Sequence, residues 1–435
     1  MHADLSLQQS PPFSVPARFL VSAPLFGLIA ALVMLWHGPE MISNRWTPEL
    51  LAVTHFLTLG FLAMSMLGAM MQLLPVLMGM VIPRPVFFSR LIHIPLFLGS
   101  AILGTAWLMN ITQLFIIAMF LLGFSFTVFI IIATERLLRS KNRHATRGMM
   151  LLALLALFIT AGMGIYLAIA YSSPEFPLAR HLSNLHLSWG LVAWAGLLIM
   201  AVAYQVIPMF QITDEYPAIH QRWMGWLLFI AMLSLSLAYS LQLEILHTLS
   251  TILLAGCLLT FALTTFWVLQ TRRRQIPDLT MKFWQLAMAS LSALTLTWAT
   301  ATLLDWKLPD FLIGVLMIHG FAITTINGMM YKIIPFIIWL HLSTRNKNLR
   351  DQGERSSQVK VPHMRKIIPE TAGLWQFRFH LVSLLLLILA SLWPQWFFYS
   401  ATLVFAVAQA TLLFNLLNAV HFYKTKITEL SNQQT

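Results

Sequence analysis

Long apolar runs separated by short polar segments dominate the chain. Such runs have the length of helices that cross a bilayer, and they lack the strict alternation of apolar and polar residues that marks a membrane β-barrel. The pattern therefore predicts an all-α polytopic membrane protein with twelve transmembrane helices in a single domain, residues 1–435. The predicted spans are 18–36, 51–78, 88–108, 112–134, 148–171, 184–210, 222–241, 246–270, 283–304, 311–340, 379–395 and 398–421.

Composition supports this class. Hydrophobic residues make up 58% of the chain and charged residues only 10%, whereas soluble domains carry about 25% charged residues. The formal net charge of +12 would suggest nucleic acid as a partner for a soluble protein. Here the basic residues lie in the segments that connect the spans, so we expect a lipid bilayer as the partner and no nucleic acid.

Basic residues also predict the orientation, because Lys and Arg are enriched in cytoplasmic loops. They cluster after spans 2, 4, 8 and 10, and the opposite side carries only Arg45, Arg180 and Lys307. We therefore expect both termini in the cytoplasm and a location in a bacterial-type inner (plasma) membrane. The expected cytoplasmic segments are the tail 1–17, the basic loop 341–377 and the tail 422–435.

A short motif recurs at the inner end of every fourth span. It reads MQLLPVLMG in span 2, YQVIPMF in span 6 and YKIIPF in span 10. Each copy has a polar residue, two aliphatic residues and a proline. Internal self-similarity is the signature of repeated structural units, so the motif predicts three four-helix arcs around a pseudo-threefold axis. Lys332, the polar residue of the third copy, is expected to snorkel to the lipid headgroups.

Each of these three spans also carries a histidine near its outer end, namely His55, His186 and His319. Ionisable residues inside a membrane usually face the bundle interior and mark function. His55 and His319 precede their prolines by 20 and 16 residues, a difference of about one helical turn, so they are expected to face the same way. His186 precedes its proline by 22 residues and is expected on a different face.

Two inward-facing histidines on separate helices suit axial ligation of a haem, so His55 and His319 are the candidate cofactor ligands. Imidazole also suits copper and zinc, which makes His186, with His181, a candidate metal site. The alternative is that these histidines are hydrogen-bonded to backbone or water. His380, near the expected start of span 11, is interpreted as an interface residue.

Three segments resemble the main subunit of the haem-copper oxidase superfamily, and the resemblance extends to the NnrS-type haem membrane proteins. They are THFLTLGFLAMSMLGAMMQLLPVLMGMVIPRP, HLSWGLVAWAGLLIMAVAYQVIPMF and HGFAITTINGMMYKIIPF. The resemblance implies twelve helices with pseudo-threefold symmetry. It also places His55 and His319 at haem-ligand positions and His186 at a copper-ligand position. A b-type haem is the expected cofactor, and copper is a further candidate.

The departures from the oxidase pattern narrow the expected function. Span 7 lacks the histidine pair of the oxidases, span 10 has one histidine where oxidases have two, and no carboxylate lies deep in a span. We therefore expect a haem-binding redox protein, or one related to nitric oxide or oxygen, with a cytochrome as a candidate partner, and not a proton-pumping oxidase. If it is an enzyme, it is an oxidoreductase. The alternative is a transporter for metal, haem or small molecules.

Overall fold

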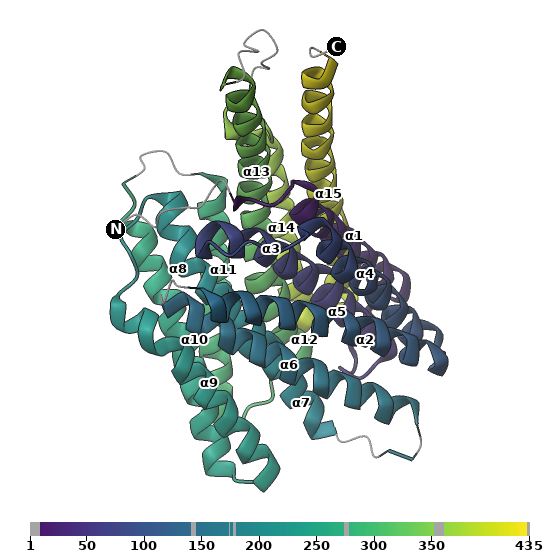
Figure 1. Ribbon diagram of the computed structural model, residues 1–435. Coiled ribbons are helices and arrows are strands. Elements are labelled where there is room, and N and C mark those ends of the chain that lie inside the picture. The colour runs from purple at the N-terminus through teal and green to yellow at the C-terminus, as the bar shows by residue number, and fades with distance from the viewer. Residues whose placement is uncertain are drawn as a thin grey trace.

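The computed structural model describes residues 9–140, 145–173, 175–176, 180–273, 278–351 and 361–432. These residues form helices and no β-strand (Figure 1). Within them, twelve helical segments are long and apolar enough to cross a membrane, which confirms the predicted polytopic class. The segments are Ser14–His37, Pro48–Val76, Pro85–Met109, Thr112–Arg139, Thr146–Ser172, His181–Gln211, Ala218–Leu241, Glu244–Gln270, Leu279–Leu303, Asp310–Asp351, Glu370–Leu392 and Pro394–Glu429.

Most of these spans are single α-helices. They are α1 (Ser14–His37), α4 (Pro85–Met109), α5 (Thr112–Arg139), α6 (Ala145–Ser172), α9 (Ala218–Leu241), α10 (Glu244–Gln270), α11 (Leu279–Leu303), α14 (Glu370–Leu392) and α15 (Pro394–Asn432). Short 3₁₀ turns occupy the connections as η2 (Pro39–Ile42) and η7 (Met364–Lys366).

The three spans that carry the repeated motif are built differently, because each contains a π-helical segment. Their elements are α2 (Pro48–His55), η3 (Phe56–Ala63) and α3 (Met64–Met78); α7 (Arg180–Ser188), η4 (Trp189–Gly196) and α8 (Leu197–Gln211); and α12 (Asp310–Gly314), η5 (Val315–Ile323) and α13 (Thr324–Asp351). In these three central spans 67%, 83% and 78% of the apolar stretch is buried, against at most 50% in the others. They form the core of the molecule.

The same packing contacts occur three times along the chain. The twelve spans divide in chain order into three groups of four, and the second span of each group is the central one. The first helix of each group packs on this central span, as α1 does on α3, α6 on α8 and α11 on α13. The last two helices of each group pack on each other, as α4 and α5, α9 and α10, and α14 and α15 do. The groups join through α5 with α6, α10 with α11 and α15 with α1. The outer helices therefore close into a ring around the central spans.

Glycines allow the central spans to approach the first helix of their group closely. A Cβ added at Gly68 of α3 would lie 2.4 Å from the Phe19 side chain of α1. A Cβ at Gly328 of α13 would lie 2.5 Å from the Phe283 side chain of α11. Small residues at membrane helix interfaces permit such contact, and here the same pairing of glycine with phenylalanine recurs in the first and third groups.

The polar residue of the repeated motif is hydrogen-bonded in each copy to the start of its own group. Gln72 donates its amide N–H to the hydroxyl of Ser10, just before α1, at 2.9 Å. Gln205 donates to the hydroxyl of Thr146, in the first turn of α6, also at 2.9 Å. Each bond ties the C-terminal part of a central span to the start of its group.

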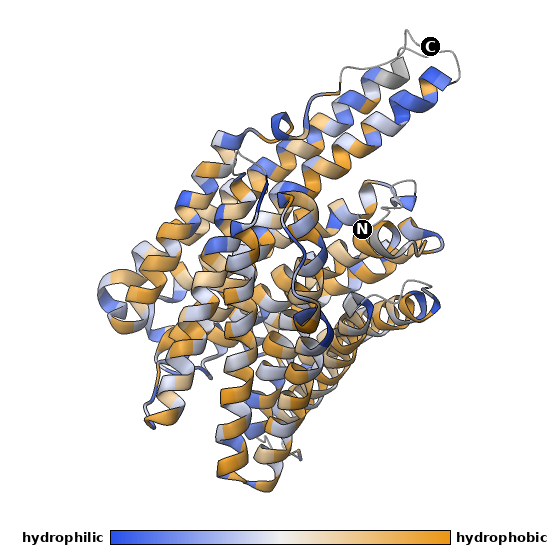
Figure 2. Ribbon diagram, turned by 90° about the vertical axis from the view of Figure 1, so that its left-hand side faces the viewer, coloured by the Kyte–Doolittle hydropathy of each residue, from blue (hydrophilic) through white to orange (hydrophobic). Residues whose placement is uncertain are grey.

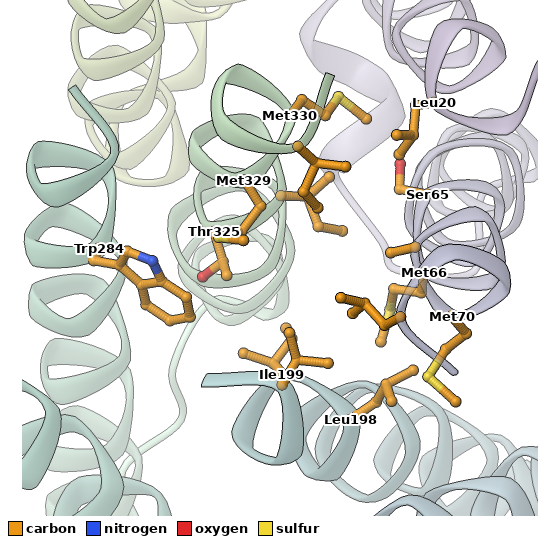
Figure 3. A pocket seen from close by; sticks show the side chains of 15 residues that line it. Leu20, Ser65, Met66, Met70, Leu198, Ile199, Trp284, Thr325, Met329 and Met330 are labelled. Atoms are coloured by element: carbon orange, nitrogen blue, oxygen red, sulfur yellow. The ribbon is translucent and has the colours of Figure 1, made fainter. Parts of the chain in front are cut away.

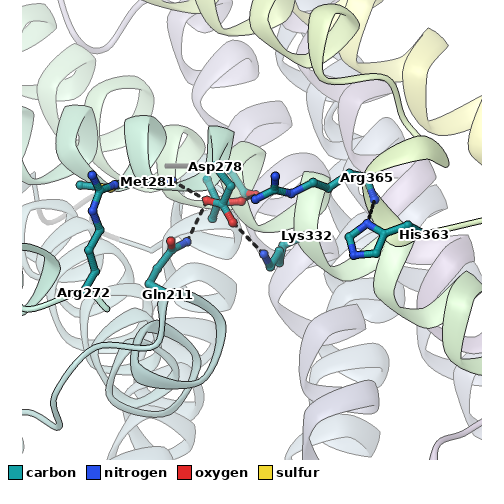
Figure 4. Close-up of polar contacts among 9 residues, drawn as sticks. Gln211, Arg272, Asp278, Met281, Lys332, His363 and Arg365 are labelled. Carbon is teal, nitrogen blue, oxygen red and sulfur yellow. Dashed lines mark hydrogen bonds and ion pairs between the residues drawn. The ribbon is translucent and has the colours of Figure 1, made fainter. Parts of the chain in front are cut away.

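The third copy replaces this neutral bond with a buried ion pair (Figure 4). Nζ of Lys332 lies 2.7 Å from Oδ2 of Asp278, the N-cap of α11, and both side chains are mostly buried. Asp278 Oδ1 also accepts the side-chain amide of Gln211, 2.9 Å away on α8, and the backbone N–H of Met281. The prediction that Lys332 snorkels to the headgroups is therefore wrong, because the lysine has a carboxylate partner within the protein.

Four helices extend further than the sequence pattern predicts, two of them near the ends of the chain and two beside the segment 352–360. α1 begins at Ser14, α13 continues to Asp351, α14 begins at Glu370 and α15 continues to Asn432. Helix therefore occupies part of the segments 1–17, 341–377 and 422–435, which were expected to be tails or a loop. Residues 1–8, 352–360 and 433–435 of these segments lie outside the described residues.

The extensions of α13 and α15 lie side by side and project beyond the other helices (Figure 1). They are hydrophilic at their tips, whereas the remaining helices are mainly hydrophobic along their length (Figure 2). This distribution agrees with a bundle embedded in lipid and two helix ends that reach water.

We predict that Asp278→Thr destabilises the protein by about 3 kcal/mol, because removing one partner of a buried pair leaves an uncompensated charge. The double variant Asp278→Thr with Lys332→Gln recreates the neutral pair of the second group and should recover most of this loss. Thermal unfolding in detergent measures both. A double variant no more stable than Asp278→Thr alone would contradict the pairing.

Candidate functional site

A cavity of about 730 Å³ lies among the N-terminal halves of the three central spans. Leucine, isoleucine, valine and aromatic side chains make up most of its wall, and His55, His186 and His319 all line it. Its volume falls within the range of about 300 to 1,000 Å³ that is typical of ligand and cofactor pockets. The structure thus brings the three predicted histidines to one cavity.

His55 and His186 form the first pair of imidazoles in this cavity. Their ring centroids lie 6.5 Å apart, with an angle of 22° between the ring planes. The sequence spacing predicts that His186 lies on a different face of its span from His55, and the structure shows that both imidazoles line the same cavity.

Backbone carbonyls orient both rings of this pair. Nδ1 of His55 lies 2.7 Å from the carbonyl oxygen of Leu51, and Nδ1 of His186 lies 3.0 Å from that of Thr160 on α6. A carbonyl can only accept, so Nδ1 carries the proton in both neutral rings and Nε2 carries the lone pair. Within the described part of the chain, neither Nε2 has a hydrogen-bond partner. This arrangement is common to histidines that bind metals.

His319 pairs with a histidine from a different helix. Its ring centroid lies 4.3 Å from that of His380 on α14, and both residues are buried. The interpretation of His380 as an interface residue is wrong, because α14 begins at Glu370, about nine residues before the predicted start of span 11. His380 therefore lies well inside the span and not at its end.

A closed set of hydrogen bonds fixes the tautomers of this second pair. Nε2 of His319 lies 2.9 Å from the hydroxyl of Ser383, which donates its own proton to the carbonyl of His380. Nε2 of His380 lies 2.6 Å from the hydroxyl of Thr324, which donates to the carbonyl of His319. Because each hydroxyl has used its only proton, both Nε2 atoms must be the donors.

The remaining nitrogens of this pair differ from each other. Nδ1 of His380 lies 3.4 Å from the side-chain amide nitrogen of Asn327, which can donate to it. Nδ1 of His319 is buried and has no hydrogen-bond partner within the described residues. His319 is thus locked in the tautomer opposite to that of His55 and His186, and its free lone pair is on Nδ1.

His181, the other candidate metal ligand, lies near the start of α7, where it is exposed and does not line the cavity. The described residues contain no cluster of three or more His, Cys, Asp or Glu side chains that could hold a metal ion. The imidazoles that line the cavity are those of His55, His186 and His319.

The polar mouth of the cavity connects all three groups of helices. Arg45, which follows η2, forms an ion pair of 3.5 Å with Asp310 at the start of α12. It also donates to the side chain of Asn184 and, at 3.4 Å, to the hydroxyl of Ser183, both on α7. The Arg45 guanidinium lies 4.6 Å from the ring centroid of Trp46. One arginine thus joins the N-terminal ends of the central spans beside the cavity.

Comparison with protein-family models and with curated protein sequences finds no match for this chain. The chemistry of the site is therefore argued from its geometry. An apolar cavity with unprotonated imidazole nitrogens can hold a large apolar group that contains a metal, and it can exclude water from that metal.

We predict that the histidines of the site divide into two tautomeric classes. His55 and His186 should carry the proton on Nδ1, and His319 and His380 on Nε2, because of their backbone and hydroxyl partners. ¹⁵N NMR of protein labelled at histidine measures this, with single His→Asn variants for assignment. Ser383→Ala should remove the preference of His319 for a proton on Nε2, because the hydroxyl that accepts from this nitrogen is lost. A proton on Nδ1 of His319 in the parent protein would contradict the hydrogen-bond arrangement.

Proposed function

We propose that this chain is a haem-binding integral membrane protein of haem-copper oxidase-like fold, with a redox role or a role with nitric oxide or oxygen. The observation that carries the proposal is the cavity of about 730 Å³ between the three most buried spans, into which His55 and His186 bring imidazoles with a free Nε2. The threefold recurrence of helix contacts supports the oxidase-like arrangement in three arcs.

The residues present fit a haem. The cavity has the volume of a cofactor site, its wall is mainly apolar, and neutral histidine is the commonest protein ligand of haem iron. A bound haem would supply one-electron chemistry and, with an open axial position, would bind nitric oxide or oxygen. The protein would hold and orient the group and shield it from water.

His55 is the first residue proposed to hold the haem, because its Nε2 is free and the Leu51 carbonyl fixes its ring. Two other residues compete to hold the group together with His55. His319 is the ligand expected from the sequence and lines the cavity, but its Nε2 is engaged by Ser383. His186 offers a free Nε2 beside His55. If His319 is the second haem ligand, His186 remains available to copper.

The proposed setting follows from the distribution of basic residues along the chain. We place the protein in a bacterial-type inner membrane with both termini in the cytoplasm and a cytochrome as the candidate redox partner. The arcs lack the additional histidines of a copper centre, so a proton-pumping oxidase is not proposed.

We predict that detergent-purified protein from haem-replete cells shows a Soret band and a b-type α band in its reduced-minus-oxidised spectrum. His55→Ala should lower the haem content per chain at least about tenfold, because loss of a ligand exceeds the effect of losing an outer-shell partner. His181→Ala is the matched control and should leave the spectrum unchanged.

Comparison of His186→Ala with His319→Ala then identifies the second residue that would hold the haem, because only the variant that lacks it should change the visible spectrum. If the parent protein contains neither iron nor a Soret band, the haem proposal fails. Uptake that depends on an ion gradient would in that case favour the transporter alternative.

A further inference from the structure

A second, smaller chamber of about 60 Å³ lies among the inner halves of the central spans (Figure 3). Residues of α3, α8 and α13 form most of its wall, and α1 and α11 add one side chain each. Four methionines, Met66, Met70, Met329 and Met330, line it, and all four are buried. The chamber is therefore an internal feature shared by all three groups of helices.

The wall of this chamber offers very little to a water molecule. Its two hydroxyl groups, those of Ser65 and Thr325, donate their protons to the backbone carbonyls of Phe61 and Phe321 on their own helices, at 2.7 and 2.9 Å. The indole of Trp284 adds mainly ring surface. Water needs two to four polar partners in a cavity, and apolar cavities stay dry and take up apolar molecules or xenon.

The chamber is adjacent to the large cavity along all three central spans. On the first central span Leu62 lines the cavity and Met66 lines the chamber. On the second central span Trp194 lines the cavity and Leu198 lines the chamber. The third span passes from cavity to chamber within residues 319–325. These separations of four to six residues correspond to about 6 to 9 Å along a helix. Only a thin layer of side chains separates the two spaces.

We propose that the chamber is a binding site for small apolar gases, with diatomic molecules such as nitric oxide or oxygen as its ligand class, and that it supplies them to the adjacent cavity. Its small volume suits a diatomic molecule, and its wall has no ligand for an ion of hard character. The methionine side chains are flexible and polarisable, so they can move to let a gas molecule pass. The binding step is independent of the proposed function, and only the supply step rests on it.

Xenon gas is the probe of the binding step, applied to haem-free, full-length protein labelled with ¹³C at the methionine methyl groups. The methyl signals of Met66, Met70 and Met330 should shift and reach a plateau as the xenon pressure rises. The methyl signal of the exposed Met109 should show only the small linear shift that dissolved xenon causes without binding. Ala69→Leu places a larger side chain in the chamber and should weaken xenon binding at least about tenfold. Ala293→Leu, on an exposed face of α11, is the matched control and should leave binding unchanged.

Met329→Ala enlarges the chamber and should strengthen xenon binding, which keeps the test decisive if Ala69→Leu fails to fold. Equal xenon shifts in the parent and in Ala69→Leu, or ordered water in the chamber, would overturn the proposal. In haem-loaded protein, Ala69→Leu should slow the return of photolysed nitric oxide to the iron without changing the Soret band. An unchanged return rate with intact xenon binding would refute the supply step alone, and absence of haem would refute the proposed function alone.

Discussion

A polar group inside a membrane protein must find its hydrogen-bond partners within the protein, because the lipid offers none. The core of this protein is organised by that constraint. Four imidazoles lie around or beside one cavity, and each is held by a carbonyl or a hydroxyl of a neighbouring turn or helix. Each of these partners accepts a hydrogen bond from one ring nitrogen, so it decides which nitrogen of that ring carries the proton and which keeps a lone pair. The position of the lone pairs determines what the cavity can bind.

The same constraint explains the C-terminal parts of the central spans, where the repeated motif lies. A polar residue one turn before a proline would be costly in lipid, and in each copy of the motif it is hydrogen-bonded to the start of the first helix of its group. The third copy uses Lys332 and Asp278 in place of two neutral side chains and adds Gln211 from the second group. A buried ion pair is weak evidence for extra stability, but it depends strongly on the correct partner and so favours one arrangement of the second and third groups.

Two spaces of different character are stacked between the central spans. One is large, carries imidazoles and has a charged mouth, and the other is small and almost free of polar groups. The π-helical segments lie at the level of the large space. Such segments are often found at functional sites, and here each lies beside or around a histidine. The proposed cofactor would occupy the large space, and the proposed gas molecule would occupy the small one.

The sequence by itself determined the helical membrane class, the twelve spans and the threefold motif, because hydrophobic run length and repetition are local signals. It also identified His55, His186 and His319 as candidate ligands, because each precedes one copy of the repeated motif. Only the tertiary structure decided how they pair, because the packing of separate spans brings His186 beside His55 and places His380 of α14 against His319. It likewise gave Lys332 a partner 54 residues away. Contacts between distant segments depend on packing, and no periodicity within a segment encodes them.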